Sequence, residues 1–148
     1  MVRAVKPGRI LTDDREIIAR AAALRRVAVL GIKTDAQADQ PAYYVAAYLV
    51  EAGVEVVPVP VYYPEATQIL GRAVVRDLAA AGAVDAVVVF RRGHDVEGHV
   101  DALLALRPPL VWLQLGIRND EAAARLCAAG LDVVQDRCVM VDHRRGRS

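Results

Sequence analysis

The sequence predicts an α/β fold, a three-layer Rossmann-like sandwich built on a five-stranded, mainly parallel sheet. Three observations support this class. Five short apolar segments alternate along the chain with segments whose apolar residues recur at helical spacing. The apolar segments are almost continuously hydrophobic, as strands are when helices cover both faces of a parallel sheet. Each connection is also long enough to return the chain to the same edge, which parallel pairing requires.

The first two elements are a helix and a buried strand. Asp13 and Glu16 have the spacing of a capping box, and apolar residues follow at helical intervals from Ile17. A helix is therefore expected over about residues 14–24. The segment RRVAVLG follows, and its apolar part, residues 27–30, is predicted to form the first strand.

A second helix is expected to begin at Pro41 and to end at Gly53, because proline is favoured at the first helical position and glycine just after the last. The segment VEVVPV, residues 54–59, is the second predicted strand. The sequence after it is less regular. A proline-rich turn and a short ILG segment precede a small helix expected at about residues 75–81.

The remaining elements continue the alternation of strands and helices. DAVVVF, residues 85–90, is the third predicted strand, and a helix over about residues 95–106 ends at two prolines. LVWLQLG is the fourth strand, which ends near Gly116. Asn119 is expected to cap the helix DEAAARLCAAG, and Gly130 to end it before the fifth strand, LDVV.

The length and composition predict one globular domain spanning residues 1–148. Hydrophobic residues make up 55% of the chain and charged residues 25%. No apolar run approaches the roughly 20 residues that span a bilayer, and the N-terminus lacks a signal-peptide core. Two cysteines without a CxxC motif indicate a reducing compartment. We therefore predict a cytoplasmic protein that does not bind membranes, and its net charge of +1 argues against nucleic-acid binding.

The ligand site is expected at one edge of the sheet, because open parallel sheets bind ligands beyond the carboxyl ends of their strands. That rule selects the segments that follow the five strands: residues 31–42, 58–63, 90–94, 114–119 and 135–138. The first of these segments leads into a helix N-terminus, whose amides and dipole favour an anionic group such as phosphate. Lys33 adds a positive charge there.

The first turn does not carry the fingerprint of a dinucleotide site. Such a site normally shows GxGxxG after the first strand and an acidic residue at the end of the second strand. This chain has Gly31 alone, and its second strand ends in PVPV. The missing acid, together with Lys33, Arg91 and Arg92 near the same rim, favours a more highly phosphorylated adenine ligand.

Five stretches of the chain resemble one family in order and spacing. They are VAVLG, QPAYYVAAYLVEAGVEVVPV, DAVVVFRR, LVWLQLGIRNDEAAARLCAAGLDVVQDRC and VMVDH. Together they are similar to the small stand-alone CoA-binding-domain proteins, which are single Rossmann-like domains like the CoA-binding N-terminal domain of the succinyl-CoA synthetase alpha subunit. The resemblance covers roughly residues 17–143, and WLQLGIRN followed by DRC is its most specific part.

The resemblance implies that the ligand is CoA or an acyl-CoA, and it assigns the contacts to four loops. The phosphates would be received by the first turn and the start of the next helix, at Gly31, Ile32, Lys33, Thr34, Ala42 and Tyr43. The adenosine end would lie beside the end of the second strand, at Pro58 and Val59. The pantetheine arm would pass the ends of the third and fourth strands, at Phe90, Arg91, Arg92, Gln114, Leu115, Gly116 and Ile117.

This chain departs from the family pattern at the proposed phosphate site. Family members commonly carry one serine near the first turn and another before the helix, where this chain has Lys33 and Ala42. They also tend to read PVNP where this chain reads PVPVYYP. Hydroxyl and amide donors are therefore lost, and Lys33 compensates in part as a point charge.

The resemblance implies binding without catalysis. In the synthetase, phosphate is transferred through a histidine of a separate downstream domain, and this chain ends where that domain would begin. We therefore expect no catalytic residue and no metal site. Two alternatives remain open: an NAD(P)-binding or acyl-transfer enzyme that uses the same crevice, and an interaction module with a decayed pocket, suggested by Ala42 and Pro60. The sequence does not indicate an oligomeric state.

Other reactive side chains favour structural interpretations. His94 and His99 flank Glu97, but their spacing does not match common zinc ligands, and exposed histidines are expected. Cys138 follows the fifth strand, where a thiolate near Arg137 is chemically able to meet the CoA thiol, although a small buried residue is favoured.

The remaining aromatic and charged residues are also interpreted as structural. Trp112 is expected in the core, Cys127 as a packing residue, and Tyr44 and Tyr48 in the core or on a partner-facing stripe. His143 is expected in a surface ion pair of a basic tail. Three further residues are expected to form a structural ion-pair network: Arg118, Asp136 and Arg137.

Overall fold

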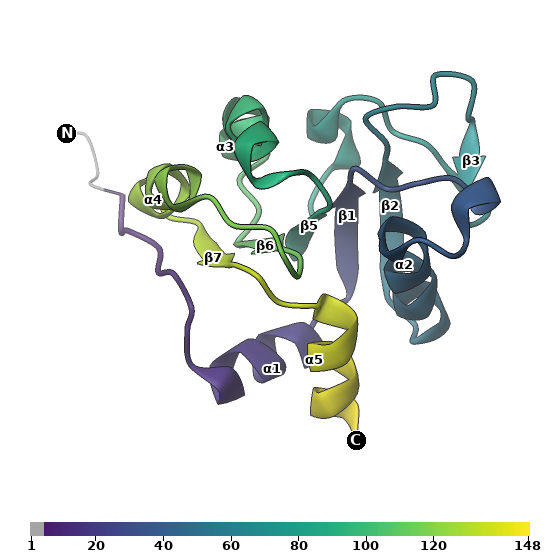
Figure 1. The fold of residues 1–148 in the computed structure, drawn as a ribbon. Coiled ribbons are helices and arrows are strands. Elements are labelled where there is room, and N and C mark those ends of the chain that lie inside the picture. The colour runs from purple at the N-terminus through teal and green to yellow at the C-terminus, as the bar shows by residue number, and fades with distance from the viewer. Residues whose placement is uncertain (1–4) are drawn as a thin grey trace.

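The computed structural model describes residues 5–148 and is built around a sheet with helices on both faces (Figure 1). Residues 1–4 of the predicted domain lie outside the described residues. In chain order the elements, with 3-10 helices labelled η, are α1 (Asp14–Ala22), β1 (Arg26–Leu30), η1 (Asp35–Gln37), α2 (Pro41–Glu51), β2 (Glu55–Val59), β3 (Gln68–Ile69), β4 (Arg72–Ala73), η2 (Leu78–Ala81), β5 (Ala86–Val89), η3 (Gly93–His99), α3 (Val100–Leu106), β6 (Leu110–Leu113), α4 (Asp120–Ala128), β7 (Asp132–Val134) and α5 (Val139–Arg147).

β1 lies inside the sheet, between β2 and β5, in the strand order β2-β1-β5-β6-β7. Every neighbouring pair is parallel, so the predicted α/β sandwich with a five-stranded parallel sheet is confirmed. After β1 the chain forms β2 on one side of β1, and later it forms β5 on the other side of β1. The connections therefore diverge between β1 and β5, which makes the carboxyl ends of these two strands a topological switch point.

Two hydrophobic cores hold the layers together, one on each face of the sheet. Alternate residues of β1 point to opposite faces. Val27 and Val29 belong to the core with α1, α2 and α5, whereas Ala28 and Leu30 belong to the core with α3 and α4. Figure 1 shows these two groups of helices on opposite sides of the sheet. Trp112 of β6 is fully buried, as the sequence predicts.

Several predicted helix boundaries are confirmed by their capping contacts. The Asp13 carboxylate accepts a hydrogen bond from the Glu16 N–H at 2.9 Å, and the Asn119 side chain accepts one from Ala122 N–H at 3.0 Å. α2 begins at Pro41, and Gly53 follows its end with φ +92°. These contacts satisfy N–H groups that the first turn of a helix leaves without an intrahelical acceptor.

The segment between β2 and β5 differs from its prediction. The small helix expected at residues 75–81 is only the short 3-10 helix η2, and Leu70 and Gly71 of ILG form the turn of the hairpin β3–β4. The Arg76 guanidinium explains part of this course, because it donates to the carbonyls of Tyr62, Tyr63 and Ala66. One side chain therefore joins three carbonyls of the loop after β2.

The helix expected at residues 95–106 begins differently as well. It starts as the 3-10 helix η3 and becomes α-helical only at Val100. Gly93 and Gly98 lie in the 3-10 part, and glycine is the weakest helix former after proline. The predicted end of this helix at the two prolines is confirmed.

The sequence did not predict α5. This helix covers residues that were expected to form a basic tail, and it packs tightly against α1: a Cβ added to Gly146 would lie 2.6 Å from the Ala22 side chain. Its first turn is held by the buried Gln114 side chain, which accepts a hydrogen bond from Val139 N–H at 2.9 Å. The last helix is therefore fixed directly to the end of β6.

The predicted surface ion pair of His143 is wrong, because His143 is buried with only 1% of its surface exposed. Its Nδ1 is paired with the Tyr48 hydroxyl at 2.9 Å, and its Nε2 has no hydrogen-bond partner in the described part of the chain. The neighbouring Asp142 is buried too and pairs with Arg137 at 2.8 Å. Burial and the positive charge of Arg147 lower the pKa of His143.

The other structural interpretations hold in part. Tyr48 is half-buried against the core, whereas Tyr44 is exposed on α2. The ion-pair network predicted for Arg118, Asp136 and Arg137 is wrong in its partners. Arg118 pairs with Asp120, and Arg137 pairs with Asp14 and Asp142. Asp136 instead accepts a hydrogen bond from the Gly116 N–H at 2.6 Å.

None of the helices in the described part of the chain is both long and apolar enough to cross a lipid bilayer.

Lowering the pH is expected to destabilise this fold through His143. Because folding lowers the pKa of His143, the unfolded chain binds the proton more readily. The contribution to stability is complete above the ordinary histidine pKa of 6.5 and is lost as the pH falls below it. Urea unfolding at several pH values should show that the free energy of unfolding falls below pH 6.5. In His143→Gln the free energy of unfolding should depend less steeply on pH. His94→Gln, at an exposed position, is the control. An equal pH dependence of the free energy of unfolding in the wild type and both variants would show that His143 is not the group responsible.

Candidate functional site

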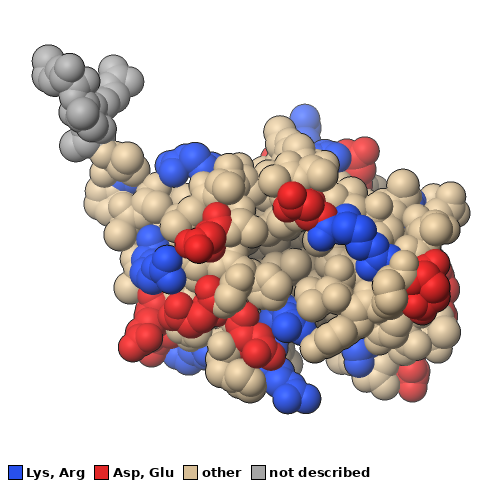
Figure 2. All heavy atoms as spheres, turned by 90° about the horizontal axis from the view of Figure 1, so that it is seen from above, with Lys and Arg blue, Asp and Glu red and all other residues tan. Residues whose placement is uncertain are grey.

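Two adjoining cavities lie at the switch point between β1 and β5. The first has a volume of about 360 Å³ and is lined by Gly31, Ile32, Lys33, Ala42, Val61, Tyr62, Tyr63, Phe90, Arg91, Arg92 and Asp95. The second, also about 360 Å³, is lined by Lys33, Gln40, Pro41, Ala42, Phe90, Arg91, Arg92, Gly116 and Ile117. Figure 2 looks down on this edge of the sheet and shows a hollow near its middle with basic side chains beside it.

Gly31 allows the turn after β1 to lie against the turn after β5. Its φ of +87° is one that L side chains rarely adopt, and an added Cβ would lie 2.2 Å from the Phe90 carbonyl oxygen. The Gly31 N–H is bonded to the Val59 carbonyl at 2.8 Å, so the same turn is also tied to the end of β2. The three strand ends that surround the first cavity are therefore joined at this glycine.

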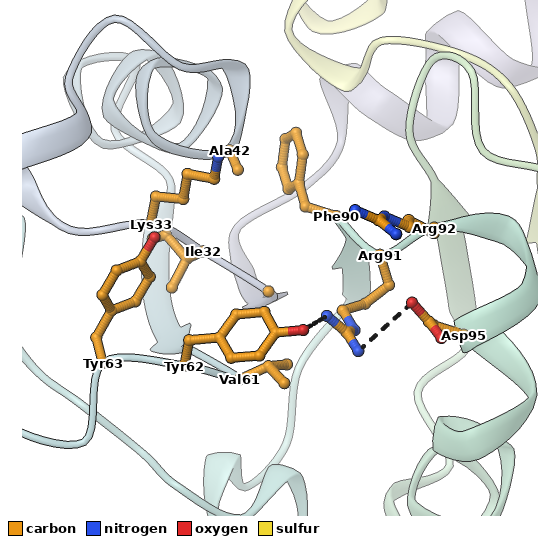
Figure 3. Close-up of a pocket in the computed structure, with 11 residues that line it drawn as sticks. Ile32, Lys33, Ala42, Val61, Tyr62, Tyr63, Phe90, Arg91, Arg92 and Asp95 are labelled. Atoms are coloured by element: carbon orange, nitrogen blue, oxygen red, sulfur yellow. Dashed lines mark hydrogen bonds and ion pairs between the residues drawn. The ribbon is translucent and has the colours of Figure 1, made fainter.

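The start of α2 forms one wall of both cavities. Pro41 has no N–H, and Ala42 N–H has no hydrogen-bond acceptor in the described part of the chain. The Lys33 N–H donates to the Ala42 carbonyl at 3.0 Å, which holds the turn after β1 against the helix. Figure 3 shows the Lys33 side chain extending toward Ala42, with its amino group close to the start of the helix. A free amide, a helix N-terminus and an amino group therefore meet at one wall.

The opposite wall is formed by the residues that follow β5. Figure 3 shows Arg91 and Arg92 across the cavity from Lys33. In the described part of the chain no ion pair involves Lys33 or Arg92. Asp95 is the one acidic residue that lines the two cavities among the described residues, and it lies 3.8 Å from Arg91. The first cavity therefore has three cationic side chains against one carboxylate.

Arg91 is the most constrained of these cations. Its side chain is only 15% exposed. Its Nε donates to His99 Nε2 at 3.1 Å, and its Nη1 lies 3.5 Å from the Tyr62 hydroxyl. Its guanidinium also lies 5.5 Å from the centroid of the Tyr62 ring, within the range of a cation–π contact.

The second cavity is more open and has an apolar floor. Phe90 and Ile117 line it together with Pro41 at the start of α2. The loop that carries Ile117 is held in place from behind, because the Asp136 carboxylate accepts from Gly116 N–H and the Asp136 N–H donates to the Ile117 carbonyl at 3.1 Å. This explains why the motifs LGIRN and DRC are found on neighbouring loops.

Asn119 connects three loops of the same edge. Besides capping α4, its side-chain amide donates to the Gly93 carbonyl at 2.9 Å, and its backbone N–H donates to the Gln135 side chain at 2.8 Å. Gln135 in turn donates to Asp120 at 3.1 Å. The sequence identified Asn119 only as a cap, because nothing local in the sequence shows which distant carbonyl an amide will reach.

A third cavity of about 350 Å³ lies on the β2 side of the first. Its lining residues are Leu30, Val59, Pro60, Val61, Arg76, Asp77, Leu78, His99 and Ala102. Val61 lines both this cavity and the first, so the two adjoin. The three cavities together follow the carboxyl edge of the sheet from β2 to β6.

Most of the predicted contact residues line these cavities. Nine line the first or second cavity: Gly31, Ile32, Lys33, Ala42, Phe90, Arg91, Arg92, Gly116 and Ile117. Val59 lines the third cavity.

Five predicted residues line none of the three. Thr34 donates its hydroxyl to Gln37, Pro58 lies inside β2, and Leu115 is 69% exposed. Tyr43 donates its hydroxyl to Asp35, which raises the pKa of Tyr43 to about 12. Gln114 is buried, with its side chain bound to α5.

Sequence reasoning missed the aromatic wall of the first cavity. Tyr62 and Tyr63 line it from the loop after β2, and Tyr63 has a positive φ of 64°. The loop at residues 58–63 was selected by the strand-end rule, but only its first two residues were assigned to the ligand. The YYP sequence in that loop was the available signal.

The histidines and cysteines do not form a metal centre in the described part of the chain, which holds no group of three potential ligands. His94 is exposed, as expected, but His99 is half-buried through its contact with Arg91. Neither Cys127 nor Cys138 lines the three cavities. Cys127 packs against the second core, as predicted, and burial raises the pKa of its thiol.

Comparison with known proteins identifies the family. The chain matches a family model described as a CoA binding domain over residues 25–144. The uncharacterized protein YneT of Bacillus subtilis (strain 168) is 32% identical over 132 residues, which cover 88% of this chain and 92% of YneT.

Solved structures agree with this match. The structure of cell-free ID.343 from Thermus thermophilus is 40% identical, has a TM-score of 0.81 and is matched over 91% of this chain and 99% of that one. A hypothetical protein from Pyrococcus horikoshii OT3 is 25% identical, with a TM-score of 0.81, over 100% of this chain and 99% of that one. With the family model matched over most of its length, this chain belongs to the CoA-binding domain family.

Proposed function

We propose that this protein is a cytoplasmic, non-catalytic binder of CoA or an acyl-CoA, and that the ligand lies along the carboxyl edge of the sheet. One observation carries the proposal. Lys33, Arg91 and Arg92 line a single cavity at the switch point, beside the free amide of Ala42. CoA carries a pyrophosphate and a ribose phosphate, and such anions are best held by several cations together with a helix N-terminus.

The phosphates are proposed to lie between the start of α2 and the loop after β5. Ala42 is small and lines both cavities, so a phosphate oxygen can approach its N–H closely. Lys33 reaches the same point from the turn after β1 and replaces part of the binding that the family's hydroxyls give. Lys33 and Arg92 have no carboxylate partner in the described residues, so a bound anion does not have to displace one.

The two ends of CoA suit the cavities on either side. The cavity near Phe90 and Ile117 offers apolar surface and an open end to the pantetheine arm and its acyl group. The cavity near Val59 and Pro60 offers apolar surface to the adenosine end. In this arrangement the ligand extends from its adenosine end at β2, across the switch point, to its pantetheine arm at β6. The family resemblance implies the same direction.

Non-catalytic binding is supported by the chemistry of the lining residues. His99 is the one histidine that lines any of these three cavities, and its Nε2 accepts a hydrogen bond from Arg91. It is therefore engaged with a cation instead of activating a nucleophile, which general-base catalysis would need. The likeness to a single domain of the synthetase alpha subunit supports the same proposal.

Titration of the purified protein with CoA is expected to give saturable binding by calorimetry. NAD and NADP should bind at least tenfold more weakly, because the turn at Gly31 lacks the other fingerprint glycines, and for NAD also because β2 ends without the acidic residue that holds its ribose. No heat at millimolar CoA would contradict the proposal and favour an interaction module. Tighter binding of NADP than of CoA would favour a nicotinamide-dependent enzyme, and conversion of acetyl-CoA during incubation would favour acyl transfer.

Lys33→Glu is expected to weaken CoA binding at least tenfold, because it reverses the charge at the phosphate end of the cavity. Calorimetric titration at low salt measures the change. Arg15→Glu, at an exposed position on α1, changes the net charge by the same amount and should leave the affinity within about twofold. Unchanged binding by the Lys33 variant would place the ligand elsewhere.

A further inference from the structure

Arg91 differs from the other two cations of the site because each of its three nitrogens lies near a protein group. Nε donates to His99 Nε2 at 3.1 Å, Nη1 lies 3.5 Å from the Tyr62 hydroxyl, and Nη2 lies 3.8 Å from Asp95. Figure 3 shows the last two contacts, with the guanidinium between Tyr62 and Asp95. The contact with His99 is the shortest of the three.

The other two contacts do not fix the guanidinium by themselves. A separation of 3.5 Å is at the long limit for a hydrogen bond, and the Asp95 carboxylate is too far away for one. Tyr62 is 64% exposed, so the packing around it gives little support. The direction of the Arg91 side chain therefore depends mainly on His99.

His99 is suited to this role by its position and protonation state. It lies at the end of η3, where the first turn of α3 begins, and lines the cavity next to the one that Arg91 lines. Burial and the charge of Arg91 lower the pKa of His99, whereas Asp95 raises it. The imidazole is consequently neutral at pH 7, so its Nε2 has a lone pair that accepts the hydrogen bond from Arg91 Nε–H, and Nδ1 carries the ring proton.

We propose that His99 is a positioning residue of the ligand site, which accepts a hydrogen bond from the Arg91 Nε–H and so directs the guanidinium toward the phosphates of the ligand. Nη1 and Nη2 each keep a proton for an anion when Nε is occupied by His99, which leaves the terminal edge of the guanidinium for bidentate contact. His99 acts through Arg91 and does not itself touch the phosphates. The inference rests on the proposed function, because it assigns this role within the same CoA site.

A double-mutant cycle tests this role. CoA is titrated at pH 7.5 into the wild type and into His99→Leu, Arg91→Ala and the double variant. Removing the acceptor should weaken binding by about three- to tenfold, as expected for one hydrogen bond. In the Arg91→Ala background, the same His99 change should alter the affinity less than about twofold, because its partner is already absent.

Two further variants separate positioning from general structural support. His99→Gln keeps an acceptor and should restore affinity to within about threefold of the wild type. His94→Leu changes the other histidine of η3, which is exposed and lines none of the three cavities, and should leave the affinity unchanged. The midpoint of thermal unfolding shows whether each variant is folded.

A measurement on the wild type covers the case in which His99→Leu does not fold. The Arg91 Nε–H signal in a nitrogen–proton NMR spectrum, assigned by its loss in Arg91→Ala, should exchange with water more slowly than that of the exposed Arg15. Equally fast exchange would overturn the inference.

The titrations distinguish failure of this inference from failure of the proposed function. A wild type that does not bind CoA overturns both. If Arg91→Ala binds CoA more weakly but His99→Leu binds it as the wild type does, the role of His99 is overturned and the proposed function is not. If His99→Leu lowers the affinity for CoA equally in the wild-type and the Arg91→Ala backgrounds, His99 does not act through Arg91. That result overturns the inference as well.

Discussion

The close approach of two turns, one after β1 and one after β5, is the constraint on which the rest of the site depends. At Gly31 the backbone passes so near to the Phe90 carbonyl that any Cβ would collide with it. Because β1 is paired to β2 and β5 along its length, the two turns must also leave the sheet in different directions. Lys33 and Arg91 both line the cavity that opens above this close contact. A larger residue at this position would separate the turns and so change the spacing of the cations.

The fold was predictable from the sequence because its strands carry a strong and simple signal. Segments such as VAVL and AVVV are apolar at every position, which a strand requires only when both faces are covered. Proline and glycine marked the ends of α2, and Asn119 marked the start of α4. Once the strands were placed, the strand-end rule selected the loops that line the cavities without any knowledge of a ligand.

The parts that were not predicted depend on contacts between residues far apart in the sequence. The sequence of α5 is typical of a basic tail, because it is polar and does not show that Asp142 and His143 are buried. Tyr62 reads as one of two loop tyrosines, and only the folded chain brings it against Arg91. Likewise, His99 is expected from the sequence to be an exposed histidine, since a sequence does not show that a histidine accepts a hydrogen bond from an arginine eight positions away. Local patterns therefore predict where the site lies, whereas the contacts within it are visible only in the folded structure.

The contact between α1 and α5 also affects how the chain acquires its structure during synthesis. Arg137, just before α5, bonds to Asp14 in α1 across 123 positions of sequence. At about 5–20 residues per second, the ribosome makes the second partner roughly 6 to 25 s after the first. During that interval Ile17 and Ala21 have no α5 to cover them, and the outer face of the sheet near β1 lacks one of its helices. The nascent chain therefore exposes a hydrophobic surface until α5 has been made, and this surface is one that a chaperone can recognise.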